Sequence, residues 1–254
     1  MPRALVLLLL GIVAAGCGGG HEAQQPTTHE VTVTATAPPP KTAQPVRLRV
    51  YFLRDGKVQP VAREVPKTKA VATAALASLL KGLTKDEQQL GLDTATRNFS
   101  GWLLEGNGIL RLEGAPALAR QALAQVVFTL TQFPTVKAVE IDGKRYTRAD
   151  FEDETPSIAV EWPLPFQHVT SPLHVTGTAN TFEATFEYEL LDPGGKVLAQ
   201  HFVTATSGSG TRGTFDVTIS FEAPKGLGKL VVFERSAADG SRIHQGEIPL
   251  TLAR

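Results

Sequence analysis

The stretch Phe128-Thr129-Leu130-Thr131-Gln132-Phe133-Pro134-Thr135-Val136 decides the fold of the first half of this chain, because it combines a helix end, a stop and a strand start. Apolar residues lead into it at helical spacing: Ala119, Ala122, Leu123, Val126, Val127 and Leu130. Proline lacks a backbone N–H and cannot continue a helix, so Pro134 ends it. Apolar residues resume between Val136 and Ile141, and Asp142-Gly143 indicates a turn. We therefore expect a helix that is followed at once by a strand.

The residues before this unit predict a hairpin and a second helix. Every second residue of 46–52 is apolar, and Asp55-Gly56 indicates a tight turn before a second strand over 58–65. From Ala70 the pattern becomes helical, with leucines at 76, 79, 80 and 83. Two further short strands, 99–104 and 109–112, flank the turn Gly106-Asn107-Gly108. Residues 46–150 are therefore expected to form an α+β domain with two helices on a small sheet.

Four pieces of this region form a recognisable set: Val50-Tyr51-Phe52, the helix 75–83, Gly91-Leu92-Asp93-Thr94, and the stretch 128–136 through Asp142-Gly143. They resemble the sporulation and spore germination domain called GerMN. The resemblance implies a lipoprotein of sporulation or germination, and related folds are thought to build rings by packing domain against domain. It therefore also implies self-association or docking onto an envelope complex.

The second half has no helical period of useful length. The acidic segment Glu152-Asp153-Glu154-Thr155-Pro156 predicts a solvated linker over 151–157, and seven strand-like runs follow it: 158–162, 173–176, 182–190, 197–205, 214–221, 229–235 and 246–252. The runs alternate between apolar and polar residues, which predicts an all-β immunoglobulin-like sandwich over 158–254. The pieces Ser171-Pro172-Leu173, Phe182-Glu183-Ala184 and Phe233-Glu234-Arg235-Ser236 resemble the immunoglobulin-like domain of bacterial spore germination proteins.

The first 17 residues have the layout of a secretory signal. Arg3 precedes an apolar run over 4–13, which is too short to span a bilayer, and small residues lead to Cys17. This layout resembles the bacterial lipoprotein signal, which implies that residues 1–16 are cleaved and that Cys17 carries lipid. The alternative is an ordinary signal peptide cut near Gly16, with Cys17 as a free thiol. Residues 17–45, rich in Pro and Thr, are expected to form a disordered tether to the outer face of the cell membrane.

Composition excludes several classes of protein. Lys+Arg and Asp+Glu both number 25, so the chain lacks the positive charge that nucleic-acid binding needs. One cysteine permits no intrachain disulfide and no thiolate cluster for zinc. We therefore expect neither nucleic acid nor a cofactor to bind.

No motif predicts catalysis or a metal site. Residues 208–213 spell G-x-G-x-x-G, but a strand follows where a phosphate-binding helix would be needed, so we expect a flexible hairpin loop. The histidines have no metal-ligand spacing: His21, His29, His168, His174, His201 and His244. The acidic linker lacks the glycine-centred loop of a calcium site. Trp102 and Trp162 are expected in the cores.

We therefore expect a non-enzymatic envelope lipoprotein that contacts a protein partner or a second copy of itself. The alternative is a protein that binds a small ligand or cell-wall glycan, in the groove between the two domains or on the loops of the sandwich. Arg54, Lys57, Gln59 and Arg63 are candidate contact residues, because the hairpin pattern places them on its solvent face.

Overall fold

The computed structural model describes residues 44–97, 101–106, 108–114, 117–222 and 226–253. The predicted signal peptide, Cys17 and nearly all of the predicted tether lie outside these residues. The described part belongs to one compact unit that begins at Thr42, and it contains two hydrophobic cores. The first core lies within residues 50–151 and the second within 158–252.

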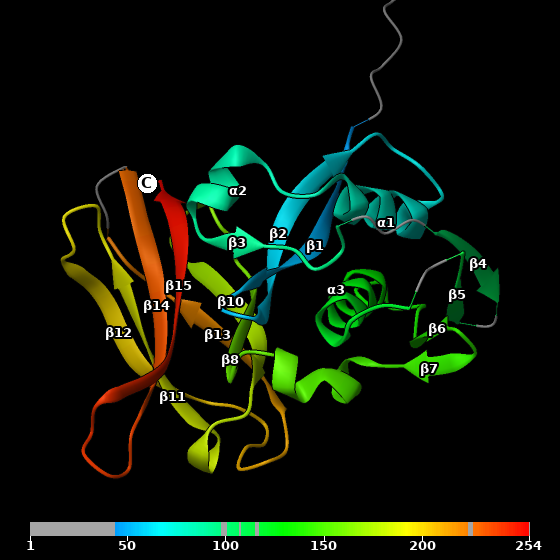
Figure 1. The fold of residues 1–254 in the computed structure, drawn as a ribbon. Helices are drawn as coiled ribbons and strands as arrows, with labels where there is room; N and C mark the ends of the chain where they lie inside the picture. The colour runs from blue at the N-terminus through cyan, green and yellow to red at the C-terminus, as the bar shows by residue number, and fades with distance from the viewer. Residues whose placement is uncertain (1–43, 98–100, 107, 115–116, 223–225, 254) are drawn as a thin grey trace, which may run out of the picture. The chain divides into compact units, whose positions relative to one another are not determined.

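The first core is enclosed by helices and two sheets (Figure 1). The strand order is β2-β1-β3 in one sheet and β4-β5-β6-β7 in the other. The strands are β1 (Val46–Arg54), β2 (Lys57–Val65), β3 (Leu92–Asp93), β4 (Trp102–Gly106), β5 (Ile109–Glu113), β6 (Ala138–Ile141) and β7 (Lys144–Tyr146). The helices are α1 (Val71–Lys81), α2 (Lys85–Gln89), α3 (Arg120–Leu130) and the 3-10 helix η1 (Arg148–Glu154).

This arrangement differs from the prediction of two helices on one small sheet. The strands form two sheets, because β1 and β2 pair with β3 and not with the β4–β7 group. The additional helix α2 has five residues, too few to show a periodic pattern in the sequence. It is stabilised by a capping box, in which the Thr84 side chain accepts from the Glu87 N–H and the Glu87 carboxylate accepts from the Thr84 N–H.

Helix α3 supplies the hydrogen-bond partners that β1 would otherwise lack. β1 pairs with β2 along its whole length, but on its other side β3 reaches only Leu53 and Arg54. Thr129 accepts the backbone N–H of Tyr51, and Gln125 donates to the Tyr51 carbonyl. Gln125 and Thr129 are fully buried, so these polar side chains stabilise the β1 backbone inside the core.

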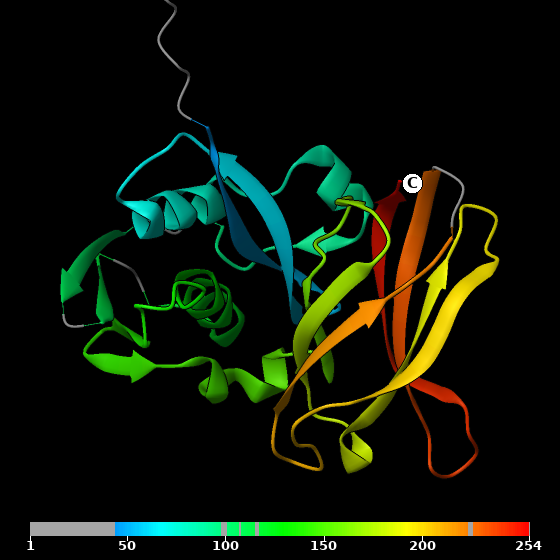
Figure 2. The ribbon, with the colours of Figure 1, turned by 180° about the vertical axis from the view of Figure 1, so that it is seen from behind.

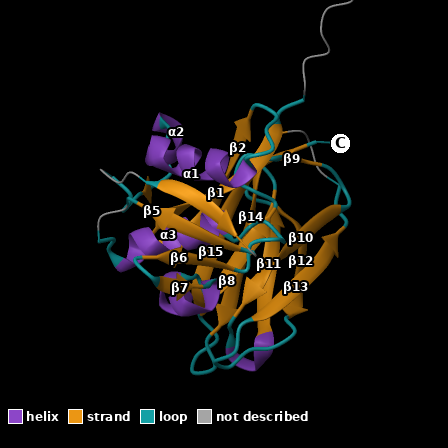
Figure 3. Ribbon diagram, turned by 90° about the vertical axis from the view of Figure 1, so that its right-hand side faces the viewer, coloured by secondary structure: helices purple, strands orange, loops and turns teal. Residues whose placement is uncertain are grey.

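The second core lies between two sheets that share no strand (Figure 2). One has the order β13-β10-β8 and the other β12-β11-β14-β15-β9. The strands are β8 (Ile158–Trp162), β9 (His168–Val169), β10 (Leu173–Ala179), β11 (Thr185–Leu191), β12 (Val197–Thr204), β13 (Gly213–Ile219), β14 (Gly226–Arg235) and β15 (Arg242–Leu252). A short 3-10 helix, η2 (Phe182–Ala184), precedes β11. This half is therefore the β-rich sandwich that the alternating runs predict (Figure 3).

The segment predicted as a solvated linker is largely packed. Phe151, inside η1, is completely buried and belongs to the first core, while Ile158 already belongs to the second. Glu154 and Thr155 are also buried. The acidic residues suggest an exposed segment, but Arg120 forms ion pairs with both Asp153 and Glu154 and so holds the segment against the first half. The predicted boundaries at 46–150, 151–157 and 158–254 stay predictions.

Candidate functional site

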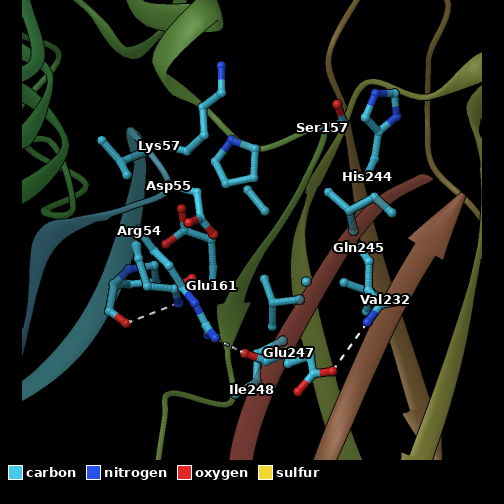
Figure 4. A pocket seen from close by; sticks show the side chains of 18 of the residues that line it. Arg54, Asp55, Lys57, Ser157, Glu161, Val232, His244, Gln245, Glu247 and Ile248 are labelled. Carbon is cyan, nitrogen blue, oxygen red and sulfur yellow. Dashed lines mark hydrogen bonds between the residues drawn. The ribbon is translucent and has the colours of Figure 1, made fainter. Parts of the chain in front are cut away.

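A cavity of about 490 Å³ lies where the β1–β2 hairpin meets β8 and β15 (Figure 4). Its lining comes from both halves of the chain: Tyr51, residues 54, 55 and 57–60, Phe128, residues 156–161, Val232 and residues 244–248. Its volume falls in the range of small-molecule and peptide sites. Three of the four hairpin residues that we predict as contact residues line it: Arg54, Lys57 and Gln59. Arg63 lies elsewhere, because it forms a bidentate ion pair with Glu87.

One wall of the cavity is a closed network of charges around Glu161 of β8. One carboxylate oxygen accepts from Arg148 at 2.8 Å, and the other accepts from Arg49 at 3.1 Å and from the Tyr51 hydroxyl. The Arg148 guanidinium also lies over the Phe128 ring, 4.7 Å from its centroid. Both arginines and Tyr51 belong to the first half, so this network connects the two cores.

Burial keeps Tyr51 protonated, and the neighbouring groups keep Arg148 charged. Burial, followed by the charge of Glu161, raises the pKa of the Tyr51 hydroxyl far above its usual value. Burial alone would lower the pKa of Arg148, but Tyr51 and Glu161 outweigh it, so that pKa is raised. A phenol that stays protonated and a guanidinium that stays charged have no proton to exchange near neutral pH. The network therefore holds the wall in place and does not resemble an acid–base pair.

Arg54 differs from every other arginine in the described residues. Each of the others forms an ion pair with a carboxylate. Arg54 instead donates to the backbone carbonyl of Glu247, at 3.1 Å, across the cavity (Figure 4). A carbonyl carries no net charge, so the positive charge of Arg54 is not neutralised by this bond.

The opposite wall is formed by paired side chains. The Glu247 carboxylate accepts from Lys229 at 2.9 Å and from Gln245 at 3.2 Å. His244 bonds the buried carboxylate of Glu234 at 2.7 Å, and the second oxygen of Glu234 accepts the Phe182 N–H. These pairs satisfy the acidic groups of this wall locally.

The residues that the sequence offers for chemistry are the histidines, the acidic side chains and Cys17. His21, His29 and Cys17 lie outside the described residues. Among the described residues, no three His, Cys, Asp or Glu side chains gather closely enough to hold a metal ion. No helix in the described part of the chain is long and apolar enough to cross a membrane.

The G-x-G-x-x-G segment is not the hairpin loop that the sequence predicts, because β12 before it and β13 after it belong to different sheets. Its Arg212 is bonded to the acidic segment. Arg212 forms two hydrogen bonds of 2.8 Å to the Glu152 carboxylate and one of 2.9 Å to the Pro156 carbonyl. Asn180 also donates to Glu152. Sequence reasoning missed this contact because 60 residues separate Arg212 from Glu152.

Trp102 is not a core residue, contrary to prediction. Its side chain is 60% exposed, and Leu104, two residues further along β4, is 49% exposed. β4 is the last strand of its sheet, so these side chains lie on an edge strand. Trp102 lies close over Gly114, where an added Cβ atom would come within 2.3 Å of the ring. Trp162 is half-buried.

Exposed apolar side chains on an edge strand indicate an interaction surface. We call Trp102 and Leu104 the β4 edge pair. On the same face, Arg111 and Arg145 both bond Glu140, so the rest of this sheet face is polar. The apolar character is therefore concentrated at the edge.

Comparisons with known proteins follow the division into two cores. Residues 49–147 match the family model described as sporulation and spore germination. Residues 157–241 match the model described as the immunoglobulin-like domain of bacterial spore germination. The comparison with curated proteins gives no match.

A solved structure that matches is the crystal structure of CopC from Methylosinus trichosporium OB3b, at 17% identity over 35% of this chain and 85% of that chain. Its TM-score of 0.24 is too low to carry an argument about fold or function. The two family models do support an assignment of the domains, because they match adjacent segments of the chain in the order that the sequence predicts. The chain therefore carries a sporulation and spore germination domain followed by an immunoglobulin-like domain of bacterial spore germination.

Proposed function

We propose that this protein is a non-enzymatic envelope lipoprotein, attached by lipid on Cys17 to the outer face of the cell membrane, that binds a protein partner through the β4 edge pair. The two matched families relate to sporulation and spore germination, which supports a role in building or docking onto an envelope assembly. The apolar leader that ends at Cys17 supports export and lipid attachment.

The β4 edge pair is the observation that carries this proposal. An edge strand presents unpaired backbone N–H and C=O groups, and soluble proteins usually protect such an edge with charged side chains or proline. β4 instead exposes a tryptophan and a leucine on the same face. Tryptophan is enriched among the residues that dominate binding energy at protein interfaces. A partner strand that added to β4 would cover both side chains and pair the edge.

Crosslinking in intact membranes tests this function. A photoreactive residue at position 104 should give a discrete crosslinked product, and mass spectrometry should identify it either as another envelope protein or as a second copy of this chain. The change Trp102→Ser should remove the product. The matched control is Phe202→Ser, because Phe202 is also an exposed aromatic side chain on an edge strand, β12. A chain without any protein neighbour at position 104 would contradict the proposal.

The cavity favours a second candidate function, the binding of a small ligand or of cell-wall glycan. Sugar rings commonly stack on exposed aromatic side chains. The aromatic residues of the described lining are Tyr51 and Phe128, and both are buried in the first core. The cavity therefore lacks a stacking surface, which makes glycan the weaker choice of ligand.

A further inference from the structure

The cavity is surrounded by strand edges. β2 is the last strand of its sheet, and β8 is the last strand of another. β15 has β14 on one side, while on the other side β9 is aligned only with Thr251 and Leu252. All three strands contribute cavity lining, through residues 57–60, 158–161 and 244–248.

The hydrogen-bond register shows which backbone groups these edges leave available. The Asn180 N–H donates to the Ser157 carbonyl, so residue 157 directs its backbone groups toward β10. Backbone direction alternates along the regular part of an antiparallel pair, so Ile158 directs its N–H and C=O groups away from β10. Because no strand in the described part of the chain lies beyond β8, these groups face no strand partner.

The same reasoning applies to β15. The carbonyl of Glu247 accepts from Arg54, and the carbonyl of Pro249 accepts from the Phe166 N–H at 2.7 Å. Both carbonyls therefore point away from β14, and the N–H of Glu247 points the same way. The Glu247 and Pro249 carbonyls are thus already bonded, and of these groups β15 offers a ligand the Glu247 N–H. Together with the free groups of β8, it supplies the kind of backbone donors and acceptors that bind an extended peptide.

The charge of the cavity indicates an anionic group on the ligand. Glu161 is paired with two guanidinium groups, those of Arg49 and Arg148, and Glu247 is paired with Lys229. The lining also contains Arg54, Lys57 and Asp55, so positive charge exceeds negative charge among these groups. A carboxylate on the ligand would reduce this excess.

Arg54 is suited to bind that carboxylate. A guanidinium has five N–H donors in a planar fork that matches a carboxylate, and one of its nitrogens is held by the Glu247 carbonyl. This contact fixes the side chain, so less entropy is lost when an anion binds.

We propose that the cavity binds the carboxyl end of a short extended peptide, whose terminal carboxylate pairs with Arg54 and whose amide groups bond the free edge of β8 and the Glu247 N–H of β15. The peptide could be the stem peptide of the cell wall or the carboxyl-terminal tail of a protein, because both present the same chemistry. This site is distinct from the β4 edge pair and does not depend on the proposed scaffold function.

A matched pair of peptide libraries tests the site on the full-length chain. Both libraries contain fluorescently labelled tetrapeptides randomised at every position; one has free carboxyl ends and the other has carboxyl-terminal amides. Fluorescence polarisation should show binding to the free-carboxyl library at least about tenfold stronger than to the amide library, because the free carboxylate accepts a charge-assisted hydrogen bond from Arg54 that the amide cannot accept. Equal binding to the two libraries, or no binding to either, would overturn the proposal.

Two variants assign the effect to Arg54. Arg54→Gln should remove the preference for the free carboxyl end, and Arg54→Lys should keep part of it, because lysine retains the charge without the fork. The control is Arg47→Gln, which lies on the same strand, is exposed and pairs with Glu64. Thermal unfolding of each variant identifies any loss of fold, and an unchanged preference in folded Arg54→Gln would refute the assignment.

Competition identifies the source of the peptide. Stem peptides released from cell wall and carboxyl-terminal peptides of envelope proteins are compared as competitors for the labelled library. Displacement of the labelled library by either kind of peptide supports the site, and the stronger competitor identifies the source of the natural ligand. Displacement by glycan strands from which all peptide has been removed would show that the cavity is a sugar site and would overturn the proposal.

Discussion

The side-chain amide of Gln132 bonds both backbone groups of Arg49. Its oxygen accepts from the Arg49 N–H at 2.9 Å, and its nitrogen donates to the Arg49 carbonyl at 2.6 Å. One amide thus replaces the strand that is missing beside this part of β1. Gln132 belongs to the stretch that decides the fold, so that stretch also stabilises the hairpin that carries Arg54.

The change Gln132→Leu should destabilise the protein by about 2–4 kcal/mol, because it leaves two backbone groups of β1 without partners. Urea unfolding followed by tryptophan fluorescence measures the loss. The control Gln121→Leu changes an exposed glutamine on the neighbouring helix, so its effect should stay within about 0.5 kcal/mol. Equal unfolding midpoints for the two variants would show that the amide does not substitute for a strand.

The contact between Arg212 and Glu152 should be visible as a shifted carboxyl titration. The hydrogen bond from Arg212 lowers the pKa of Glu152, and burial opposes this only in part. The pKa of Glu152 is therefore lower in the folded protein than in the unfolded chain. The stability that this contact contributes is complete above the usual glutamate pKa, and it is lost as the pH falls through the pKa of Glu152 in the folded protein.

In Arg212→Ala the pKa of Glu152 should rise, and the protein should lose less of its remaining stability on acidification. Carbon-13 NMR of the side-chain carboxyl groups measures the titration directly. Arg235→Ala, which removes an exposed ion pair with Glu187, serves as the control and should leave Glu152 unchanged. A Glu152 titration that is identical in wild type and Arg212→Ala would rule out the contact in solution.

Tyr51 should resist ionisation at high pH. Burial, and then the negative charge of Glu161, raises the pKa of its hydroxyl. The pKa of Tyr51 is therefore higher in the folded protein than in the unfolded chain. The stability that the protonated hydroxyl contributes is complete below the usual tyrosine pKa, and it is lost as the pH rises toward the pKa of Tyr51 in the folded protein. An ultraviolet titration of tyrosinate should therefore show one tyrosine of the three ionising only as the protein unfolds.

Removing the hydroxyl identifies that group. In Tyr51→Phe the late step of the titration should disappear. Retention of the late step in this variant would assign it to another tyrosine.

Lipid attachment at Cys17 can be tested by substitution. Cys17→Ser should accumulate as unprocessed precursor and should not incorporate labelled palmitate, because serine has no thiol to acylate. The lipid chains matter for location, since each buried methylene contributes about 0.8 kcal/mol to membrane binding. Normal processing together with membrane attachment of the variant would mean that the leader is an ordinary signal peptide.

The sequence predicts the elements of this fold better than their polar contacts. Apolar spacing over 119–130 predicts a helix, and the structure has α3 over Arg120–Leu130. The same spacing does not predict the roles of Gln125 and Thr129. A pattern of apolar residues cannot show that a buried polar side chain forms a hydrogen bond with the backbone of a strand. Phe151 is missed for a related reason, since one aromatic residue among four acidic ones forms no pattern.

The candidate sites show a similar limit. Alternation in the hairpin predicts that Arg54 and Lys57 lie off the core, and they do line the cavity. That Arg54 bonds a backbone carbonyl and not a carboxylate cannot be read from the sequence, because that carbonyl belongs to Glu247, 193 residues away. Trp102 is misplaced because residues 102–104 are all apolar and show no alternation. The structure packs Leu103 against the first core, which leaves Trp102 and Leu104 on the exposed face.

The position of Glu161 limits how such chains can diverge. Its carboxylate belongs to the sandwich, while Arg49, Tyr51 and Arg148 belong to the other half. If recombination joined this sandwich to a first half without those arginines, a partly buried carboxylate would be left unpaired, which is strongly destabilising. The two halves are therefore matched to each other at this contact, and the partners of Glu161 lie both 13 residues earlier in the chain, at Arg148, and 112 residues earlier, at Arg49.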